Sequence, residues 1–122
     1  MRVLFLDDSH ERQTRFKYHR VGCVLVQAYT FQEAINALKN QDPFDEAHLD
    51  HDLSEAAAAG KPSPNERTGQ DVARFIVEMQ PHLRPKKIIL HSFNFHGRAR
   101  MAQILNDAGI GAIIAQWNLL GS

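Results

Sequence analysis

The chain has 122 residues, and its 14 Lys and Arg are balanced by 14 Asp and Glu. This length suits a single domain over residues 1–122, and zero net charge argues against non-specific nucleic-acid binding, which usually needs a basic excess. No apolar run approaches the ~18 residues of a membrane span, and no signal-peptide pattern opens the chain. The one cysteine, Cys23, excludes an internal disulfide, so a reducing cytoplasm is the expected location.

Strand and helix patterns alternate through the first half of the chain. A continuous apolar run predicts a strand over about residues 2–6, and Ser9 is the expected N-cap of the following helix. Residues 23–29 predict a second strand, in which we interpret Cys23 as a small buried residue and not as a nucleophile. A second helix begins after Thr30, ends before Pro43, and has one apolar face made of Phe31, Ala34, Ile35 and Leu38.

The second half continues the alternation after a long polar loop. We expect a third strand over about residues 44–49, and a loop over residues 54–68 with at most one helical turn in "SEAAAA". Thr68 begins a helix whose apolar face consists of Val72, Phe75, Ile76 and Met79. Residues 86–92 predict a fourth strand, residues 96–109 a helix that stops at Gly109, and residues 110–116 a fifth strand.

Five apolar strands separated by helices indicate an α/β protein with a parallel sheet. Right-handed crossovers favour a flavodoxin-like, doubly wound sheet of five strands in the order 2-1-3-4-5. No last helix fits between the fifth strand and Ser122, so one sheet face near strands 1 and 5 should be thinly covered. That face is a candidate surface for a homodimer or another partner.

Polar residues gather where the predicted strands end, and in an open parallel sheet those carboxyl ends form one ligand-binding edge. The residues concerned are Asp7, Asp8, Asp50, His51, Asp52, His91, Ser92, Asn94 and Gln116. Neighbouring carboxylates cannot all stay ionised without a cation, and Mg²⁺ or Mn²⁺ with oxygen ligands is the simplest one. Zn²⁺ is a second choice because His and Asp occur together. The alternative is a solvated polar rim, in which Asp8 only caps a helix.

Two of the seven histidines follow neighbouring strands and face this edge. Opening a cyclic phosphodiester with water requires a base for the water and an acid for the departing oxygen, and His51 and His91 could supply that pair. The alternative is that both only donate hydrogen bonds around the site. His48 and His96 remain open between structural and ligand-contacting roles, whereas His10, His19 and His82 are expected at the surface.

The order of these acids resembles the receiver domain of two-component response regulators. The resemblance implies that Asp7 and Asp8 are its acid pair, Asp50 its phosphoryl acceptor, and Asp52 the residue whose carbonyl binds metal. Ser92 or His91 falls at its Ser/Thr position. The chain departs from receivers at Gln116, where they have a Lys, in lacking the last helix, and in the length of the loop over residues 54–68.

"LFLDD", "HLDHDLS", "TGQDVARFI" and "IILHSFNFHGRARM" are similar, more specifically, to the cyclic-phosphate processing receiver domains. That resemblance spans nearly the whole chain and implies cyclic-phosphate chemistry. It implies a metal held by Asp7, Asp8, Asp50 and Asp52, and acid–base roles for His51 and His91. Phosphate or substrate contacts are expected at Ser92, Asn94, Arg98 and Gln116, and closure over a nucleotide is one interpretation of Lys61 and Arg67 on the long loop.

Three functions therefore stay open. The first is a metal-dependent phosphoesterase for a cyclic, nucleotide-linked phosphate, with Phe93, Phe95 or Trp117 facing the ligand. The second is a degenerate receiver, a signalling or partner-binding module that either is phosphorylated on Asp50 or binds its partner without phosphorylation. The third is a protein that binds a cyclic nucleotide without hydrolysing it, which no sequence pattern can separate from the first.

Overall fold

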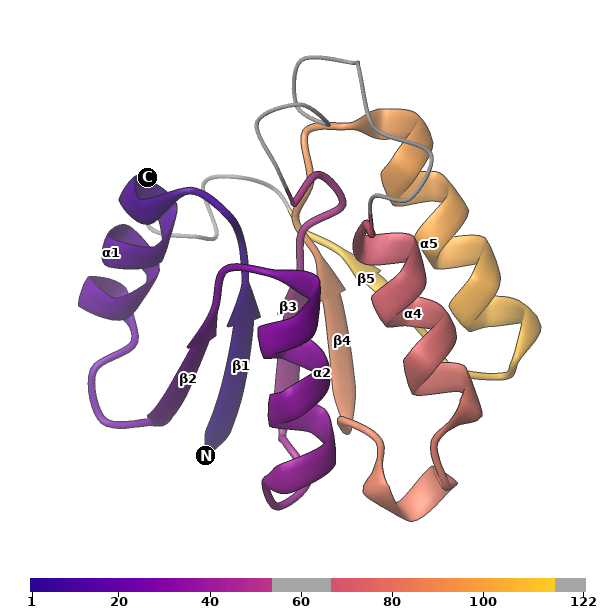
Figure 1. Ribbon diagram of the computed structural model, residues 1–122, viewed down its shortest axis with the longest axis horizontal. Helices are drawn as coiled ribbons and strands as arrows, with labels where there is room; N and C mark the ends of the chain where they lie inside the picture. The colour runs from indigo at the N-terminus through magenta and orange to yellow at the C-terminus, as the bar shows by residue number, and fades with distance from the viewer. Residues whose placement is uncertain (54–66, 116–122) are drawn as a thin grey trace.

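The computed structural model describes residues 1–53 and 67–115, and these form a parallel sheet flanked by helices (Figure 1). The sheet order is β2-β1-β3-β4-β5, which confirms the predicted flavodoxin-like order. The strands are β1 (Arg2–Leu6), β2 (Val24–Ala28), β3 (Glu46–Leu49), β4 (Lys87–Leu90) and β5 (Ile113–Ile114). Central strands buried on both sides explain the continuous apolar runs.

The helices divide unequally between the two faces of the sheet. The helices are α1 (His10–His19), α2 (Phe31–Asn40), α4 (Gly69–Glu78) and α5 (Phe95–Asp107), and a short 3₁₀ turn, η1, spans Pro81–Leu83. Three of them, α2, α4 and α5, pack on the face that carries Leu4, Leu6 and Leu90. In the described part of the chain, α1 alone covers the other face, where Phe16 packs on Val3 and Phe5. Among the described residues, this second face thus has less helical cover than the first.

Polar caps set the helix starts where the sequence indicates them. The side chains of Ser9, Thr30 and Thr68 accept backbone N–H groups in the first turns of α1, α2 and α4. Thr68 and Asp71 form a reciprocal capping box, which satisfies two otherwise unpaired donors. After α5, Gly109 adopts a left-handed φ of 78°, which glycine reaches without strain, so it is the expected stop signal.

The edges of the sheet differ most from expectation. β5 is a two-residue strand and not a seven-residue one, and both its residues are exposed because nothing pairs with its outer side in the described residues. β3 begins at Glu46 and not at Phe44. Cys23 is only half-buried, and its thiol donates to the Arg20 carbonyl at 3.0 Å. The expected helical turn in residues 54–59, and Lys61, Gln116 and Trp117, lie outside the described residues.

Strand register brings the site together. Leu6 pairs with Leu49, and Leu49 pairs with Leu90, so the next residues, Asp7, Asp50 and His91, form a row across three strands. Backbone bonds continue this alignment, because the Asp50 amide donates to the Leu6 carbonyl and the His91 amide to that of Leu49. His91, rather than Ser92, is thus level with Asp50. None of the described helices is long and apolar enough to cross a membrane.

Candidate metal and phosphate site

Three carboxylates converge at the carboxyl ends of β1 and β3. One oxygen from each of Asp7, Asp8 and Asp50 lies within 4.8 Å of the others. Asp7 and Asp50 are buried, whereas the Asp8 side chain is 25% exposed and forms the open side of the group. An all-oxygen set of this size and charge fits a hard divalent cation such as Mg²⁺. The acidic cluster expected from the sequence is therefore present and could bind a divalent metal.

Arg12, from the first turns of α1, reaches into this cluster. Its Nε donates to Asp7 Oδ2 at 2.7 Å and its Nη2 to Asp7 Oδ1 at 2.9 Å, a bidentate pair. The same Nη2 lies 3.8 Å from Asp8 Oδ1 and 3.7 Å from Asp50 Oδ2. One guanidinium nitrogen thus faces all three carboxylates. Sequence reasoning missed Arg12, although its place four residues after Asp8, one helical turn on, was the available signal.

The pKa of Asp7 is shifted in the opposite direction from those of Asp8 and Asp50. Burial would raise the pKa of Asp7, but hydrogen bonds from His91 and Arg12 lower it below its usual value. Burial raises the pKa of Asp50 to about 8, and the nearby Asp7 charge adds to this effect. Burial and the Asp7 charge also raise the pKa of Asp8. The site therefore keeps Asp7 ionised and makes a second and third negative charge costly.

His91 lies beneath Asp7 and not at the open side of the cluster. Its ring is buried, stacks on Phe5 at a centroid distance of 4.7 Å, and its Nε2 lies 3.0 Å from Asp7 Oδ2. Since Asp7 is ionised, Nε2 must carry the proton and donate it. Burial also lowers the pKa of His91, which keeps the ring neutral. This geometry orients Asp7 from behind.

His51 lies on the other side of the edge, against α4 and α5. Its Nδ1 is 2.7 Å from Asp52 Oδ1, so Nδ1 must donate, and its Nε2 is 3.0 Å from the side-chain nitrogen of Gln70. Gly97 packs so closely that a methyl group there would overlap the ring. Successive residues of an extended chain point to opposite sides, so His51 faces away from the row of Asp7, Asp50 and His91. The two histidines share the edge but use different partners.

The remaining expected residues form the connection between β4 and α5. Buried Ser92 accepts the Asn94 amide through its Oγ, and Asn94 caps α5 by accepting the Gly97 amide. The Asn94 side-chain nitrogen donates to Asp52 Oδ1 at 3.2 Å. The Asp52 carboxylate is thus engaged by His51 and Asn94 and is not in the three-carboxylate group. Its expected role rests on its backbone carbonyl.

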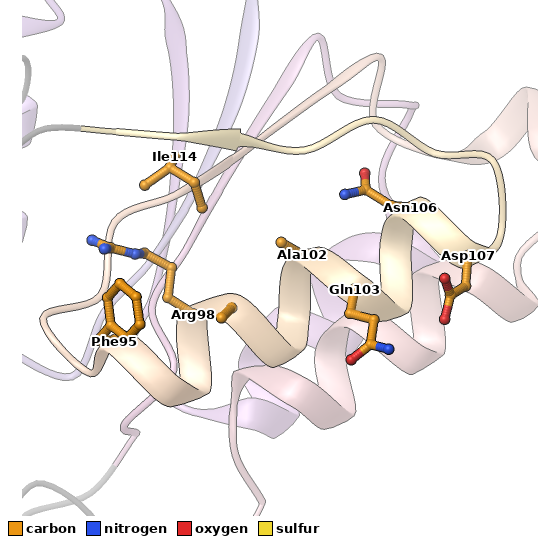
Figure 2. Close-up of a pocket in the computed structure, with 8 residues that line it drawn as sticks. Phe95, Arg98, Ala102, Gln103, Asn106, Asp107 and Ile114 are labelled. Carbon is orange, nitrogen blue, oxygen red and sulfur yellow. The ribbon is translucent and has the colours of Figure 1, made fainter.

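Arg98 lines a groove beside α5 (Figure 2). The groove, of about 510 Å³, runs between α5 and β5 and is lined by Phe95, Arg98, Ala102 and Ile114, among others. Arg98 donates to the Ser92 carbonyl and packs over the Phe95 ring. Phe93 and Phe95 are 70% and 65% exposed, so neither is a core residue.

The other five histidines divide into four exposed residues and one buried residue. His10, His19, His82 and His96 are exposed, and Asn94, not His96, caps α5. His48 is buried on the α1 face, where its Nε2 lies 2.9 Å from Glu46 Oε1, and burial lowers its pKa to about 4. The described contacts of His48 therefore lie on the α1 face of the sheet and do not include the three-carboxylate group. Gln70 and Gly97, which hold the His51 ring, were missed because only the packing of helices brings them to it.

Comparison with known proteins places this geometry in a family. The family model described as "Cyclic-phosphate processing Receiver domain" matches residues 2–107. No curated protein matches the chain.

Solved structures show the same fold. A response regulator from Burkholderia pseudomallei, whose structure contains a phosphorylated aspartic acid, a calcium ion and citrate, has a TM-score of 0.64 at 16% identity over 94% of this chain. The chain spans 59% of that protein's length. The bacteriophytochrome response regulator AtBRR has a TM-score of 0.62 at 13% identity, and the match covers 96% of this chain and 84% of AtBRR. The response regulator domain of Thermotoga maritima CheB has a TM-score of 0.59 at 21% identity, and the match covers 93% of this chain and 77% of the CheB domain.

These structural neighbours establish the receiver fold, and the family match covers most of the chain together with every member of the three-carboxylate group. The chain belongs to the cyclic-phosphate processing receiver domains.

Proposed function

We propose that this protein is a metal-dependent phosphoesterase that opens a cyclic phosphate, nucleotide-linked, at the three-carboxylate group. The observation that carries the proposal is the meeting of Asp7, Asp8 and Asp50 within 4.8 Å, with the Arg12 guanidinium against them. An acidic group with one adjacent cation suits a divalent ion and a phosphate together, because the cations offset both sets of negative charge.

Asp7, Asp8 and Asp50 are the residues that would hold the ion. When bound, Mg²⁺ or Mn²⁺ would neutralise the carboxylates and polarise a phosphate oxygen. Zn²⁺ is less suited because the group contains only carboxylate oxygens among the described residues. His91 supports this role by donating to Asp7, which fixes the orientation of that carboxylate. We expect its removal to weaken metal binding.

His51 is the proposed acid–base residue, and it would act from the α4 and α5 side of the sheet edge on a ligand that extends across that edge. Ring opening by water forms a new P–O bond and breaks one P–O bond of the ring, while one proton leaves the water and one reaches the departing oxygen. Asp52 accepts from Nδ1 and so leaves Nε2 as the atom that takes up a proton, as in other carboxylate-oriented histidines. The Gln70 amide contacts Nε2, so Gln70 has to turn away when His51 acts.

The rest of the ligand would lie toward α5. Ser92, Asn94 and Arg98 follow β4 directly, and Arg98 reaches from the Ser92 carbonyl to the groove of Figure 2. That groove has an apolar wall and one guanidinium, which suits a nucleoside attached to the phosphate. Gln116 remains a proposed contact from beyond the described residues.

The test is hydrolysis of 2′,3′- and 3′,5′-cyclic nucleotides with Mg²⁺, Mn²⁺ or EDTA. We expect metal-dependent ring opening that His51→Ala abolishes at unchanged metal affinity. His91→Ala should lose turnover together with metal affinity, because it acts through Asp7. A folded protein that opens none of these rings with any metal would contradict the proposal.

A phosphorylated receiver is the second candidate. It is favoured by the position of Asp50, which directly follows β3, a strand in register with β1 and β4. The same fold occurs in the Burkholderia pseudomallei regulator whose structure contains a phosphorylated aspartic acid. Incubation with acetyl phosphate and Mg²⁺ followed by intact mass separates the two. A stable added phosphoryl group that Asp50→Asn prevents would favour signalling.

We propose a reducing cytoplasm as the location and a homodimer as the assembly. The supporting observation for the dimer is the sheet face beside α1, where Ile113 is 48% exposed and a pocket of about 200 Å³ opens near His48. Light scattering after size-exclusion chromatography would test the assembly. A monomer at all concentrations would refute it.

A further inference from the structure

Arg12 stands where the carboxylates of the site need a positive charge. It contacts both oxygens of Asp7, and its Nη2 lies within 4 Å of oxygens from Asp8 and Asp50. An arginine fork is rigid and always charged, so it can neutralise a carboxylate group without a metal. The same carboxylates are the proposed metal ligands, so the guanidinium and a divalent ion would use the same oxygens.

The hydrogen bonds of Asp7 show that the Arg12 guanidinium and a metal ion cannot both bind the Asp7 carboxylate in its present arrangement. Asp7 Oδ1 accepts from the Ser9 amide at 2.8 Å and from Arg12 Nη2 at 2.9 Å. Asp7 Oδ2 accepts from Arg12 Nε at 2.7 Å and from His91 Nε2 at 3.0 Å. A carboxylate offers about four lone-pair positions, and all four are taken. A metal ion that binds Asp7 must therefore displace a donor.

Arg12 is the donor best able to leave. The Ser9 amide is held at the start of α1, and the His91 ring is buried against Phe5. The Arg12 side chain is 28% exposed and has a long flexible stem. When a metal repels it from Asp7, it stays tethered beside the group, where its planar fork suits the paired oxygens of a phosphate.

We propose that Arg12 is an exchangeable cation of this site, which neutralises the acidic group without metal and turns to the phosphate once a metal has displaced it. The first half stands on the geometry alone. The second half rests on the proposed function, because it requires a phosphate ligand. Arg12 would then supply a charge that receivers take from the Lys at the position of Gln116.

The first test is titration of the metal-free protein with Mg²⁺ and Mn²⁺ by calorimetry, comparing wild type, Arg12→Gln, Arg12→Lys and Arg15→Gln. Arg15 is the matched control, because it lies on the same helix and forms its ion pair with Glu11, away from the three-carboxylate group. We expect Arg12→Gln to bind metal about tenfold more tightly or better, since a competing charge at less than 4 Å is gone. Arg15→Gln should match wild type, and Arg12→Lys should fall between. Equal or weaker metal binding by folded Arg12→Gln would overturn the proposal.

A second measurement covers the case in which Arg12→Gln does not fold. In wild-type protein, the NMR signal of the Arg12 Nε–H group reports its bond to Asp7 directly. Saturating Mg²⁺ should move this signal and speed its exchange with water, while the Arg15 signal stays in place. An Arg12 signal that metal leaves unchanged would overturn the exchange.

The phosphate half is tested with inorganic phosphate in saturating Mg²⁺. Arg12→Gln should bind phosphate about tenfold more weakly than wild type, and Arg12→Lys should recover part of the loss because it restores the charge but not the fork. Unchanged phosphate affinity in Arg12→Gln would refute this half. Metal exchange without hydrolysis would refute only the proposed function, and hydrolysis without exchange would refute only the role of Arg12.

Discussion

The face of the sheet that carries α2, α4 and α5 and the face that carries α1 bury different chemistry. The first has a large apolar cluster that includes Leu6, Leu49, Ile76 and Leu105, and His51 is a buried polar side chain at its margin. The second has a small apolar cluster around Phe5 and Phe16, and beside it lie buried ionisable groups: Asp7, Glu46, His48, Asp50 and His91. The comparison teaches that one face stabilises the fold, whereas the other lowers the stability of the fold because it buries the ionisable groups of the site. Four substitutions can break or sharpen this division.

Leu105→Ala should have the largest effect. Leu105 is fully buried in the apolar face, so its truncation should lower the free energy of unfolding by about 3–4 kcal/mol through lost burial and a residual cavity. Urea denaturation measures this value. Mg²⁺ affinity of the folded protein should not change, because Leu105 lies in the last turn of α5 and is not part of the three-carboxylate group. A loss below about 1 kcal/mol would refute a stabilising role for this face.

Gly97→Ala should be next, because an added methyl group overlaps the His51 ring. The ring has to move between α4 and α5, which should cost about 2–3 kcal/mol despite the better helix propensity of alanine. Gly111→Ala is the matched control, since no atom lies within 4 Å of a methyl group there. Thermal unfolding of both variants gives the comparison. Equal stability of the two would show that His51 is not tightly held.

Asp50→Asn should stabilise the metal-free protein at pH 9. The unfolded carboxyl loses its proton near pH 3.8 and the folded one near pH 8, so the contribution of Asp50 to stability falls as pH rises through this window. The amide carries no charge, so we expect a gain of about 2 kcal/mol at pH 9 and little at pH 4. Unfolding at both pH values, with and without Mg²⁺, measures it. Metal should stabilise only the wild type. If metal-free Asp50→Asn were less stable than wild type at pH 9, the inference that the Asp50 charge destabilises the fold would be wrong.

His48→Gln should give the smallest effect, visible only in acid. His48 takes up a proton near pH 6.5 when unfolded and near pH 4 when folded, so its contribution to stability is lost as pH falls between these values. Gln can still donate to Glu46 but cannot be protonated. The variant should therefore lose about 1 kcal/mol less than wild type between pH 7 and pH 4. The measurement is the free energy of unfolding of both proteins between pH 7 and pH 4. An equal loss in the two would show that protonation of His48 does not cause the loss of stability in acid.

Patterns in the sequence were sufficient for most of the fold. Alternating apolar runs and helix caps at Ser9, Thr30 and Thr68 are local signals, and the sheet order follows from the handedness of crossovers. The ends of β3 and β5 were less predictable. Strand length depends on which neighbour supplies hydrogen bonds, and β5 has one neighbour only in the described residues.

The acidic group was also predictable, because Asp7, Asp8 and Asp50 directly follow strands whose ends must meet. The roles of the histidines were not. His51 and His91 look equivalent along the chain, but one residue of difference in register turns their side chains to opposite sides of the sheet edge. The dense packing of Gly97 then fixes His51 against α5.

By itself the sequence determined the order of strands and helices, the edge where a ligand would bind, and three of its acids, since all of these follow from local periodicity and chain topology. Only the tertiary structure decided which charges share that edge. Arg12 is the clearest case: its guanidinium faces Asp50, 38 residues away in the chain, only because β1 pairs with β3 and α1 packs beside them. Charge balance at short range is a property of atoms brought together by folding, and no pattern along the chain contains it.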